Sequence, residues 1–337
     1  MAEIINNKQL VRQFHAALEK TQGNDLNSVF KEYLADNYSF KGVHPFNELN
    51  NVNDVIEHVW QPLFHSFKAL QRREDIFIAG QSEADGGEWV MSMGHFMGLF
   101  DRDWLGITPS HKLATIRYAE FNCVKDGKII QTGFFVDIIG VMLQVGLNPL
   151  PLSTGQYFTY PGPRTHDGVR LGEGSDEQST RTMNLVNQMI DNLTALNQSG
   201  INTCPPEVLA KTWDQNMVWY GPAGIGATYT IERYQQQHMY PFREGLTGKV
   251  FNGHICRFAE DEYACFFGWP NLTNTAIGGF LGLPGANTPA DMRVVDVYHR
   301  EGDKLVENWV IIDLPYWLKQ QGLDILKRTQ SIANPRA

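Results

Sequence analysis

The sequence predicts an α+β fold that is built twice, with each copy made of helices followed by a curved antiparallel sheet. The chain has 337 residues, enough for two domains of roughly 100–200 residues each. Hydrophobic residues make up 42% and charged residues 19%, which is typical of globular proteins and not of disordered ones. The third observation, an internal repeat, sets the domain organisation.

The repeat is clearest in residues 116–150, which align with residues 292–326 without a gap, at an offset of 176. This alignment pairs Glu120 with Asp296 and Asp137 with Asp313. Shorter matches follow the same order along the chain: residues 61–63 with 240–242, 89–95 with 263–269, and 104–107 with 280–283. We therefore predict a tandem duplication, with domains at residues 1–150 and 181–337 joined by a Gly-, Pro-, Ser- and Thr-rich linker at residues 151–180.

Helices are expected first within each copy. Residues 8–22 carry apolar side chains at helical spacing, a second short helix ends near Ala35, and a third covers residues 54–67. The copy of the third helix begins near Thr230.

Strands follow from about Asp75 onward. Residues 88–100 and 113–124 are expected strands, residues 125–128 form a hairpin turn, and residues 129–139 form the returning strand. Residues 301–304 repeat this turn in the copy.

Charge and targeting signals narrow the function. The net charge is −9 and no basic stripe occurs, which argues against nucleic-acid binding. The first residues lack the order of a signal peptide, and no apolar window is long enough to span a membrane. We expect a soluble, cytoplasmic protein whose four cysteines are buried thiols without disulfides.

One expected strand face carries a single histidine among apolar groups. Alternation places Trp89, Met91, Met93, His95, Met97 and Leu99 on this face. Either this face packs in the core with a hydrogen-bonded His95, or it walls a ligand cavity with His95 as the acid/base group. Trp269 occupies the position of His95 in the copy.

Carboxylates and arginines repeat on the following strand. Arg117 and Glu120, like their copies Arg293 and Asp296, lie three residues apart and so face opposite sides of a regular strand. Two interpretations of Glu120 and Asp296 stay open. Each is either a desolvated carboxylate with a raised pKa, suited to acid/base catalysis, or the partner of a lysine or arginine.

Asp137 and Asp313 end the returning strand just before a helix, where an aspartate is a good N-cap. Glu307 and Trp309 share the face of Asp313, so a tryptophan-walled carboxylate pair is the alternative there. Metal and nucleotide motifs are absent, and neither His238 nor His254 has a second ligand at metal spacing, so we expect no metal and no cofactor.

Several segments together are similar to a known family. They are residues 94–98, 103–109, 117–121 and 126–129 in the first copy, and 280–284, 293–298 and 304–309 in the second. Each copy resembles a SnoaL-like domain, the polyketide-cyclase branch of the NTF2-like superfamily. The resemblance implies a cone-shaped domain with a deep apolar pocket, and closure of a polyketide ring by an intramolecular aldol reaction without metal or cofactor.

The sequence departs from the family pattern at the acid/base position. The usual aspartate of the last strand is replaced by Phe134 and Val310, and the earlier histidine by Glu120 and Asp296. Cyclase-type chemistry would therefore rest on Glu120 or Asp296, with His95, Asp137 or Asp313 as further candidates.

We expect the first copy to be the active one, with Glu120 as base, His95 as partner acid and Arg117 as oxyanion stabiliser or structural ion-pair partner. The expected substrate is a small, mostly apolar oxygenated molecule. The alternatives are a non-catalytic small-molecule-binding protein, an epoxide hydrolase or isomerase, and a copy that serves only as an interface. Single NTF2-like domains commonly dimerise through the sheet, so the resemblance implies a monomer whose two domains pair within the chain. The expected substrate-binding residues are Arg117, Trp89, Met91, Met93, Trp104, Trp269, Arg293 and Trp309.

Overall fold

The computed structural model describes residues 2–199 and 204–333, and the chain divides into two compact units. The first unit comprises Met1–Pro149, Arg164–Glu173 and Leu323–Ala337, and the second comprises Leu150–Pro163 and Gly174–Gly322. The segment expected as a linker is thus shared between the units, and its last part belongs to a helix that starts at Asp176. The domain boundaries at residues 150 and 181 stay a prediction.

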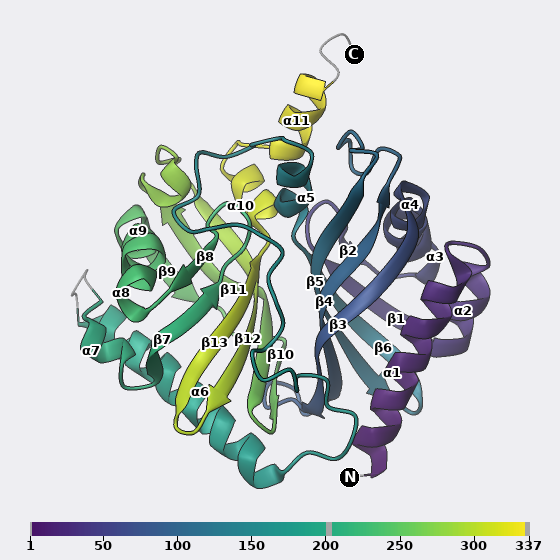
Figure 1. Cartoon of the computed structure of the whole chain (residues 1–337), viewed down its shortest axis with the longest axis horizontal. Helices are drawn as coiled ribbons and strands as arrows, with labels where there is room; N and C mark the ends of the chain where they lie inside the picture. Colours follow the sequence, from purple (N-terminus) through teal and green to yellow (C-terminus); the bar gives the residue numbers. More distant parts are fainter. Residues whose placement is uncertain (1, 200–203, 334–337) are drawn as a thin grey trace. The chain divides into compact units, whose positions relative to one another are not determined.

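The first unit combines helices with a six-stranded sheet (Figure 1). The expected order of helices first and strands second was wrong, because two strands precede the third helix and further helices follow the last strand. Its strand order is β2-β1-β6-β5-β4-β3. The elements are α1 (Ala2–Thr21), α2 (Leu26–Tyr33), β1 (Leu34–Gly42), β2 (Asn47–Leu49), α3 (Val52–Val55), the π-helix η1 (Ile56–Trp60), α4 (Gln61–Ser66), β3 (Phe67–Gln81), β4 (Glu88–Phe100), β5 (Leu113–Lys125), β6 (Lys128–Val136), α5 (Ile138–Gln144) and α11 (Ile325–Ala333).

The second unit repeats this plan with the order β10-β11-β12-β13-β7-β8, while β9 also pairs with β11. Its elements are α6 (Asp176–Gln198), α7 (Pro206–Leu209), β7 (Trp213–Tyr220), β8 (Ala227–Tyr229), α8 (Ile231–Tyr234), the π-helix η2 (Gln235–Met239), α9 (Tyr240–Gly245), β9 (Leu246–Phe251), β10 (Cys256–Glu260), β11 (Tyr263–Ala276), the 3₁₀ helix η3 (Phe280–Gly282), β12 (Pro289–Glu301), β13 (Lys304–Ile312) and α10 (Leu314–Gln320).

The strand registers confirm the gapless alignment of the repeat. Glu120 of β5 lies opposite Phe134 of β6, and Asp296 of β12 lies opposite Val310 of β13. The α+β plan and the hairpin turns are therefore as predicted. Another expectation was wrong, because each sheet is mixed: β1 pairs with β6, and β7 with β13, in parallel.

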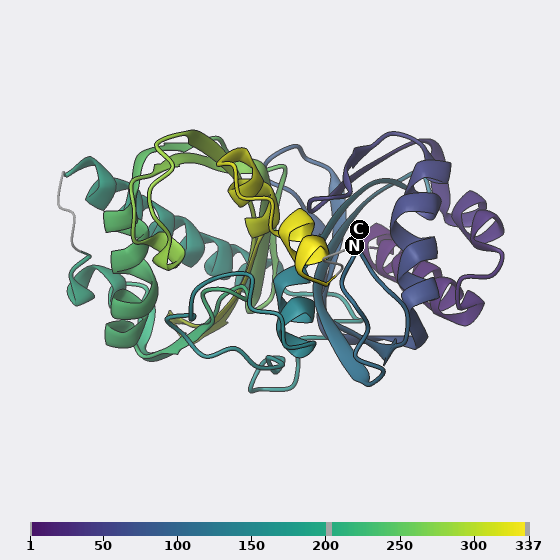
Figure 2. The same ribbon diagram turned by 90° about the horizontal axis from the view of Figure 1, so that it is seen from above.

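In each unit, helices lie on the inner side of the curved sheet, as Figure 2 shows from above. In the first unit, His15 of α1 contacts Glu120, and Trp60 of η1 packs on Phe134, which identifies the inner face of that sheet. Residues of β5 at odd spacing from Glu120, such as its immediate neighbours, therefore point to the outer face.

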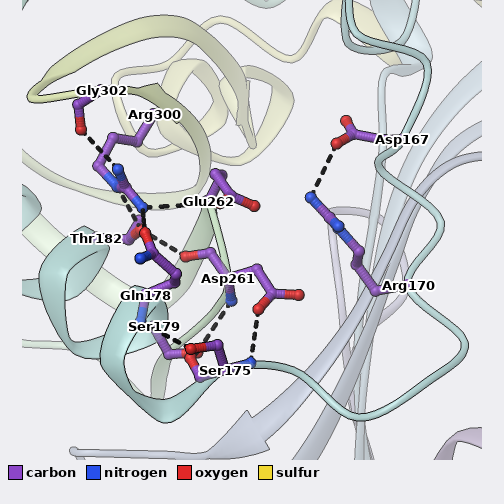
Figure 3. Close-up of polar contacts among 10 residues, drawn as sticks. All are labelled: Asp167, Arg170, Ser175, Gln178, Ser179, Thr182, Asp261, Glu262, Arg300 and Gly302. Carbon is purple, nitrogen blue, oxygen red and sulfur yellow. Dashed lines mark hydrogen bonds and ion pairs between the residues drawn. The ribbon is translucent and has the colours of Figure 1, made fainter.

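Polar contacts hold the start of α6 against the sheet of the second unit (Figure 3). Arg300 of β12 donates to the Thr182 hydroxyl at 2.7 Å and to the Gln178 side chain at 2.7 Å, and it donates to the Gly302 carbonyl at 2.6 Å. Asp261 accepts from the Ser175 amide at 2.7 Å. This anchoring matters for the site, because the later turns of α6 line a cavity.

No helix within the described ranges is long and apolar enough to cross a membrane. All four cysteines lie within those ranges, are buried and form no disulfide, as the sequence predicts.

Candidate functional site

The inner face of the second unit encloses a cavity of about 230 Å³. Its walls come from α6, β7, the α8–η2–α9 helical run, β11, β12 and β13. Most lining groups are apolar or aromatic, including Trp213, Trp219 and Phe242, and Asp296 is the carboxylate among them. A mostly apolar hollow with a few convergent polar groups is the usual form of a small-molecule site.

Asp296 is held by neutral hydrogen-bond donors. The Tyr298 hydroxyl donates to its Oδ1 at 3.1 Å, and the Asn308 amide donates to the same oxygen at 3.3 Å. Among the residues that the structure describes, no lysine or arginine forms an ion pair with this carboxylate. Burial raises the pKa of Asp296 to about 6, although the hydrogen bonds from Asn308 and Tyr298 act to lower it.

Asp296 reaches the cavity from β12, whereas β13, the last strand, has the apolar Val310 at the adjoining position. Val310, which occupies that last-strand position, lies directly opposite Asp296 in the ladder between β12 and β13. Both residues line the cavity. The carboxylate therefore reaches the same hollow from the neighbouring strand.

Glu120, the counterpart of Asp296, has the opposite environment. Its side chain is 0% exposed and accepts from Arg72 at 2.7 Å and from Asn122 at 2.9 Å, and it lies 3.0 Å from His15 Nε2. Burial acts to raise the pKa of Glu120, but Arg72, His15 and Asn122 outweigh it and hold the pKa far below its usual range. Of the two interpretations, the ion-paired carboxylate fits Glu120 and the raised pKa fits Asp296.

The first unit has a different space on this side of its sheet. A hollow of about 370 Å³ lies beside His15 and Arg72, the partners of Glu120, but its wall carries the charged groups Arg12, Glu19 and Glu74 and does not include Glu120.

A cavity of about 10 Å³, lined in part by His15, Arg72, Trp60 and Phe96, is large enough for about one water. Phe96 packs on Tyr118 at 4.5 Å between ring centroids, and Arg72 lies over both rings at 4.8 and 4.6 Å. Aromatic rings and an arginine thus fill the volume that stays open in the second unit.

The structure does not bring His95 and Glu120 together. His95 lies opposite Arg117 in the ladder, and Glu120 lies opposite Ser92, so the two side chains are on different faces of the sheet. His95 Nδ1 is 3.3 Å from Asp75. The expected pair of base and partner acid is therefore not formed.

The ion pair of Arg293 and Asp313 does not line the cavity, and Arg117 and Asp137 hold the equivalent positions in the first unit. Asp137 accepts from the Gly140 amide and Asp313 from the Tyr316 amide, so both residues cap the following helices. Arg293 pairs with Asp313 at 3.3 Å and lies between the rings of Trp269 and Tyr316, at 3.8 and 3.5 Å from their centroids. Arg117 points to the outer face of the first sheet, because it lies three residues before Glu120, which points to the inner face.

The other residues expected to bind substrate make packing and hydrogen-bond contacts within the fold. Trp89, Met91 and Met93 are buried on the outer face of the first sheet, opposite to Glu120. Trp104 packs edge-on against Phe67. Trp309 stacks on Tyr220 and donates to the Pro161 carbonyl at 3.0 Å, while Glu307 pairs with His299 at 2.9 Å.

Sequence reasoning missed most of the cavity wall, above all His238 and Tyr234 on the α8–η2 run. The match of residues 61–63 with 240–242, extended back along the helix, could have found them. It pairs His238 with Val59 and Tyr234 with Val55. A polar or aromatic residue that replaces valine in one copy of a duplicated helix is a sign of divergent use.

Within residues 2–199 and 204–333, no group of three or more histidine, cysteine, aspartate or glutamate side chains is arranged to hold a metal ion.

Three solved structures that the chain matches each correspond in length to one unit. One is a protein from Jannaschia sp. CCS1 assigned as a SnoaL-like polyketide cyclase (19% identity, 43% of this chain and 94% of that chain, TM-score 0.33). Another is an NTF2-like protein from Burkholderia xenovorans LB400 (10% identity, 42% and 97%, TM-score 0.34). The third is IdmH from Streptomyces antibioticus, assigned as a polyketide cyclase (14% identity, 40% and 98%, TM-score 0.34).

Each unit has the α+β plan that the sequence predicts, with the same strand order and matching registers in its sheet. No protein-family model matches the chain, and no curated protein matches it significantly.

Proposed function

We propose that the second unit is a cofactor-independent acid/base enzyme of the polyketide-cyclase-like type, with Asp296 as the general base. The observation that carries the proposal is a carboxylate with a pKa of about 6, without a cationic partner among the described residues, in the wall of a mostly apolar cavity of about 230 Å³. A base with a pKa near the working pH is ionised at neutral pH and still accepts a proton readily.

The proposed step is removal of a proton from the carbon next to a substrate carbonyl. The C–H electron pair becomes the enolate, and the proton goes to Asp296. In a cyclase-type reaction the enolate carbon then forms a bond to a second carbonyl carbon of the same molecule, and the resulting alkoxide takes the proton back from Asp296. In an isomerase-type reaction the proton returns to a different carbon. Neither sequence needs an oxidant, a reductant or a metal.

The surrounding residues suit this role. Tyr298 and Asn308 orient the carboxylate through their hydrogen bonds. Burial raises the pKa of the Tyr234 hydroxyl and lowers the pKa of His238 to about 3, so both side chains are neutral at physiological pH. Neutral donors in an apolar wall can stabilise an enolate oxygen without forming an ion pair that would quench the base.

The test is the pH dependence of turnover. We expect a purified preparation, incubated with a panel of small enolisable ketones and diketones and analysed by LC–MS, to form product at a rate that rises through about pH 6 and is flat above pH 7. The sign follows from the chemistry, because only the ionised carboxylate acts as base. His238 adds no second limb in this range, since its pKa is about 3.

Asp303→Asn is the matched control, because Asp303 lies exposed in the β12–β13 turn and its replacement should leave the profile unchanged. A rate that is independent of pH between 5 and 8 would contradict Asp296 as base. If no compound reacted but an unchanged small molecule remained bound, the non-catalytic binding protein would be favoured.

A further inference from the structure

His238 is a buried polar group without a protein partner at one of its ring nitrogens. It lies on the π-helix η2, is 9% exposed and lines the cavity of the second unit. Its ring stacks on Trp219 at 4.0 Å between centroids and 18° between planes. The Nδ1 atom is buried and has no hydrogen-bond partner among the described residues.

A buried ring nitrogen without a partner carries an uncompensated desolvation cost, so its presence calls for an explanation. Burial keeps the His238 ring neutral, and a neutral imidazole presents one N–H donor and one acceptor. Asn271 is a second such case in the same cavity wall, because its side-chain Oδ1 is also buried without a partner. Two unsatisfied polar groups therefore border one apolar hollow.

The first unit lacks both groups. His238 corresponds to Val59 in the equivalent helix. Asn271 lies in the bulge of β11 between Gly268 and Leu272, and this bulge has no counterpart in β4, whose pairing with β5 is regular. The π-helix itself is present in both units, as η1 and η2.

The first unit has atoms of its own without a hydrogen-bond partner among the described residues, His15 Nδ1 and Arg72 Nη1, but they border a hollow lined by charged groups. His238 and Asn271 are specific to the second unit and line its mostly apolar cavity, where the oxygen of a ligand would satisfy them.

The volume bounds the size of that ligand. A protein cavity of about 150 Å³ holds benzene, so about 230 Å³ accommodates roughly nine to eleven non-hydrogen atoms. The stacked His238 and Trp219 rings, with Phe242 and Tyr234 nearby, give the hollow flat aromatic walls. A multi-ring polyketide exceeds this space.

We infer that the cavity selects a planar one- or two-ring molecule of about ten non-hydrogen atoms that carries a hydroxyl or carbonyl oxygen, and that His238 recognises this oxygen. Asn271 supplies a second polar contact. This deepens the proposed function by naming its substrate class, yet it concerns binding and is decided without turnover.

The experiment compares 2-naphthol with naphthalene, which differ by one hydroxyl. Affinities are measured through the fluorescence of the cavity residues Trp213 and Trp219 and repeated by calorimetry. The His238→Phe variant keeps an aromatic ring on Trp219 but has no ring nitrogen. We expect the ratio of the two affinities to fall by about tenfold in this variant, through weaker binding of 2-naphthol with naphthalene binding retained. Taking the ratio cancels the different hydrophobicity of the two probes.

His238→Gln provides a rescue, because an amide restores a donor and an acceptor, and we expect it to regain part of the preference for 2-naphthol. It also serves as the second variant if His238→Phe folds poorly. An unchanged ratio in both variants would overturn the assignment of His238, whatever the outcome of the turnover assay. Absence of turnover with the expected ratios would instead contradict the proposed function alone.

Discussion

Replacement of Asp296 by asparagine is expected to stop turnover and, at the same time, to make the protein more stable at neutral pH. A positioned general base contributes about 10²–10⁴-fold to a rate, so the Asp296→Asn variant should lose activity by about that factor. The gain in stability follows from the pKa of about 6, which means that the fold disfavours the ionised carboxylate.

The pH dependence of this gain has a definite sign. The folded protein keeps the Asp296 proton up to about pH 6, whereas the unfolded chain loses it near 3.8. Between these values the folded state binds more protons, so its stability falls as the pH rises, and the full penalty is present above pH 6. Asparagine does not ionise, and two pKa units correspond to about 3 kcal/mol, so the variant should be more stable by about 2–3 kcal/mol at pH 7.5.

The measurement is urea unfolding of the wild type and of Asp296→Asn at pH 7.5 and pH 4.0. We expect the difference in the free energy of unfolding to be largest at pH 7.5 and almost absent at pH 4.0. The Asp303→Asn control removes an exposed carboxylate from the β12–β13 turn and should change stability by less than about 0.5 kcal/mol at both values. A variant that is less stable than the wild type at pH 7.5 would show that Asp296 is a structural carboxylate.

The elements that sequence reasoning predicted well are those with local signals. The strand at residues 88–100 is found as β4 with these bounds, and the turn at 125–128 joins β5 to β6. Asp137 and Asp313 are recognisable as N-caps from their neighbours alone. Duplication added long-range information, because it indicated which strands had to be equivalent.

What the sequence did not reveal depends on contacts between distant residues. β1 joins the sheet by parallel pairing with β6, almost a hundred residues later, and its polar residues Asp36 and Asn37 weaken the pattern of a buried strand. The protonation of Glu120 depends on His15, which is 105 residues away, and on Arg72, which is 48 residues away. Such partners decide whether a buried carboxylate is a base or an ion-pair member, and no periodicity encodes them.

The counterpart change in the first unit should have the opposite effect on stability. Glu120→Gln removes the negative charge from a carboxylate that pairs with Arg72 at 2.7 Å and with His15 at 3.0 Å, and it leaves the buried Arg72 guanidinium without its counter-charge. Removal of one partner of a buried ion pair usually costs about 3–5 kcal/mol. We expect a loss of that size in urea unfolding at pH 7.5, against less than about 0.5 kcal/mol for the exposed control Glu57→Gln.

Acid should reduce this loss, because the stabilising effect of Glu120 is present above its unfolded pKa of 4.5 and disappears as the pH falls toward its much lower folded pKa.

The turnover rate per folded molecule shows which of the two units carries the base. If Asp296 is the base, Glu120→Gln keeps the wild-type rate although it unfolds more easily. A folded Glu120→Gln protein that had lost its activity would place the base in the first unit, and the ion pair would then be part of the catalytic machinery. If Glu120→Gln lowers the stability and Asp296→Asn raises it, the two equivalent carboxylates have different roles. Glu120 then stabilises the fold through its ion pairs, and Asp296 accepts a proton in the reaction.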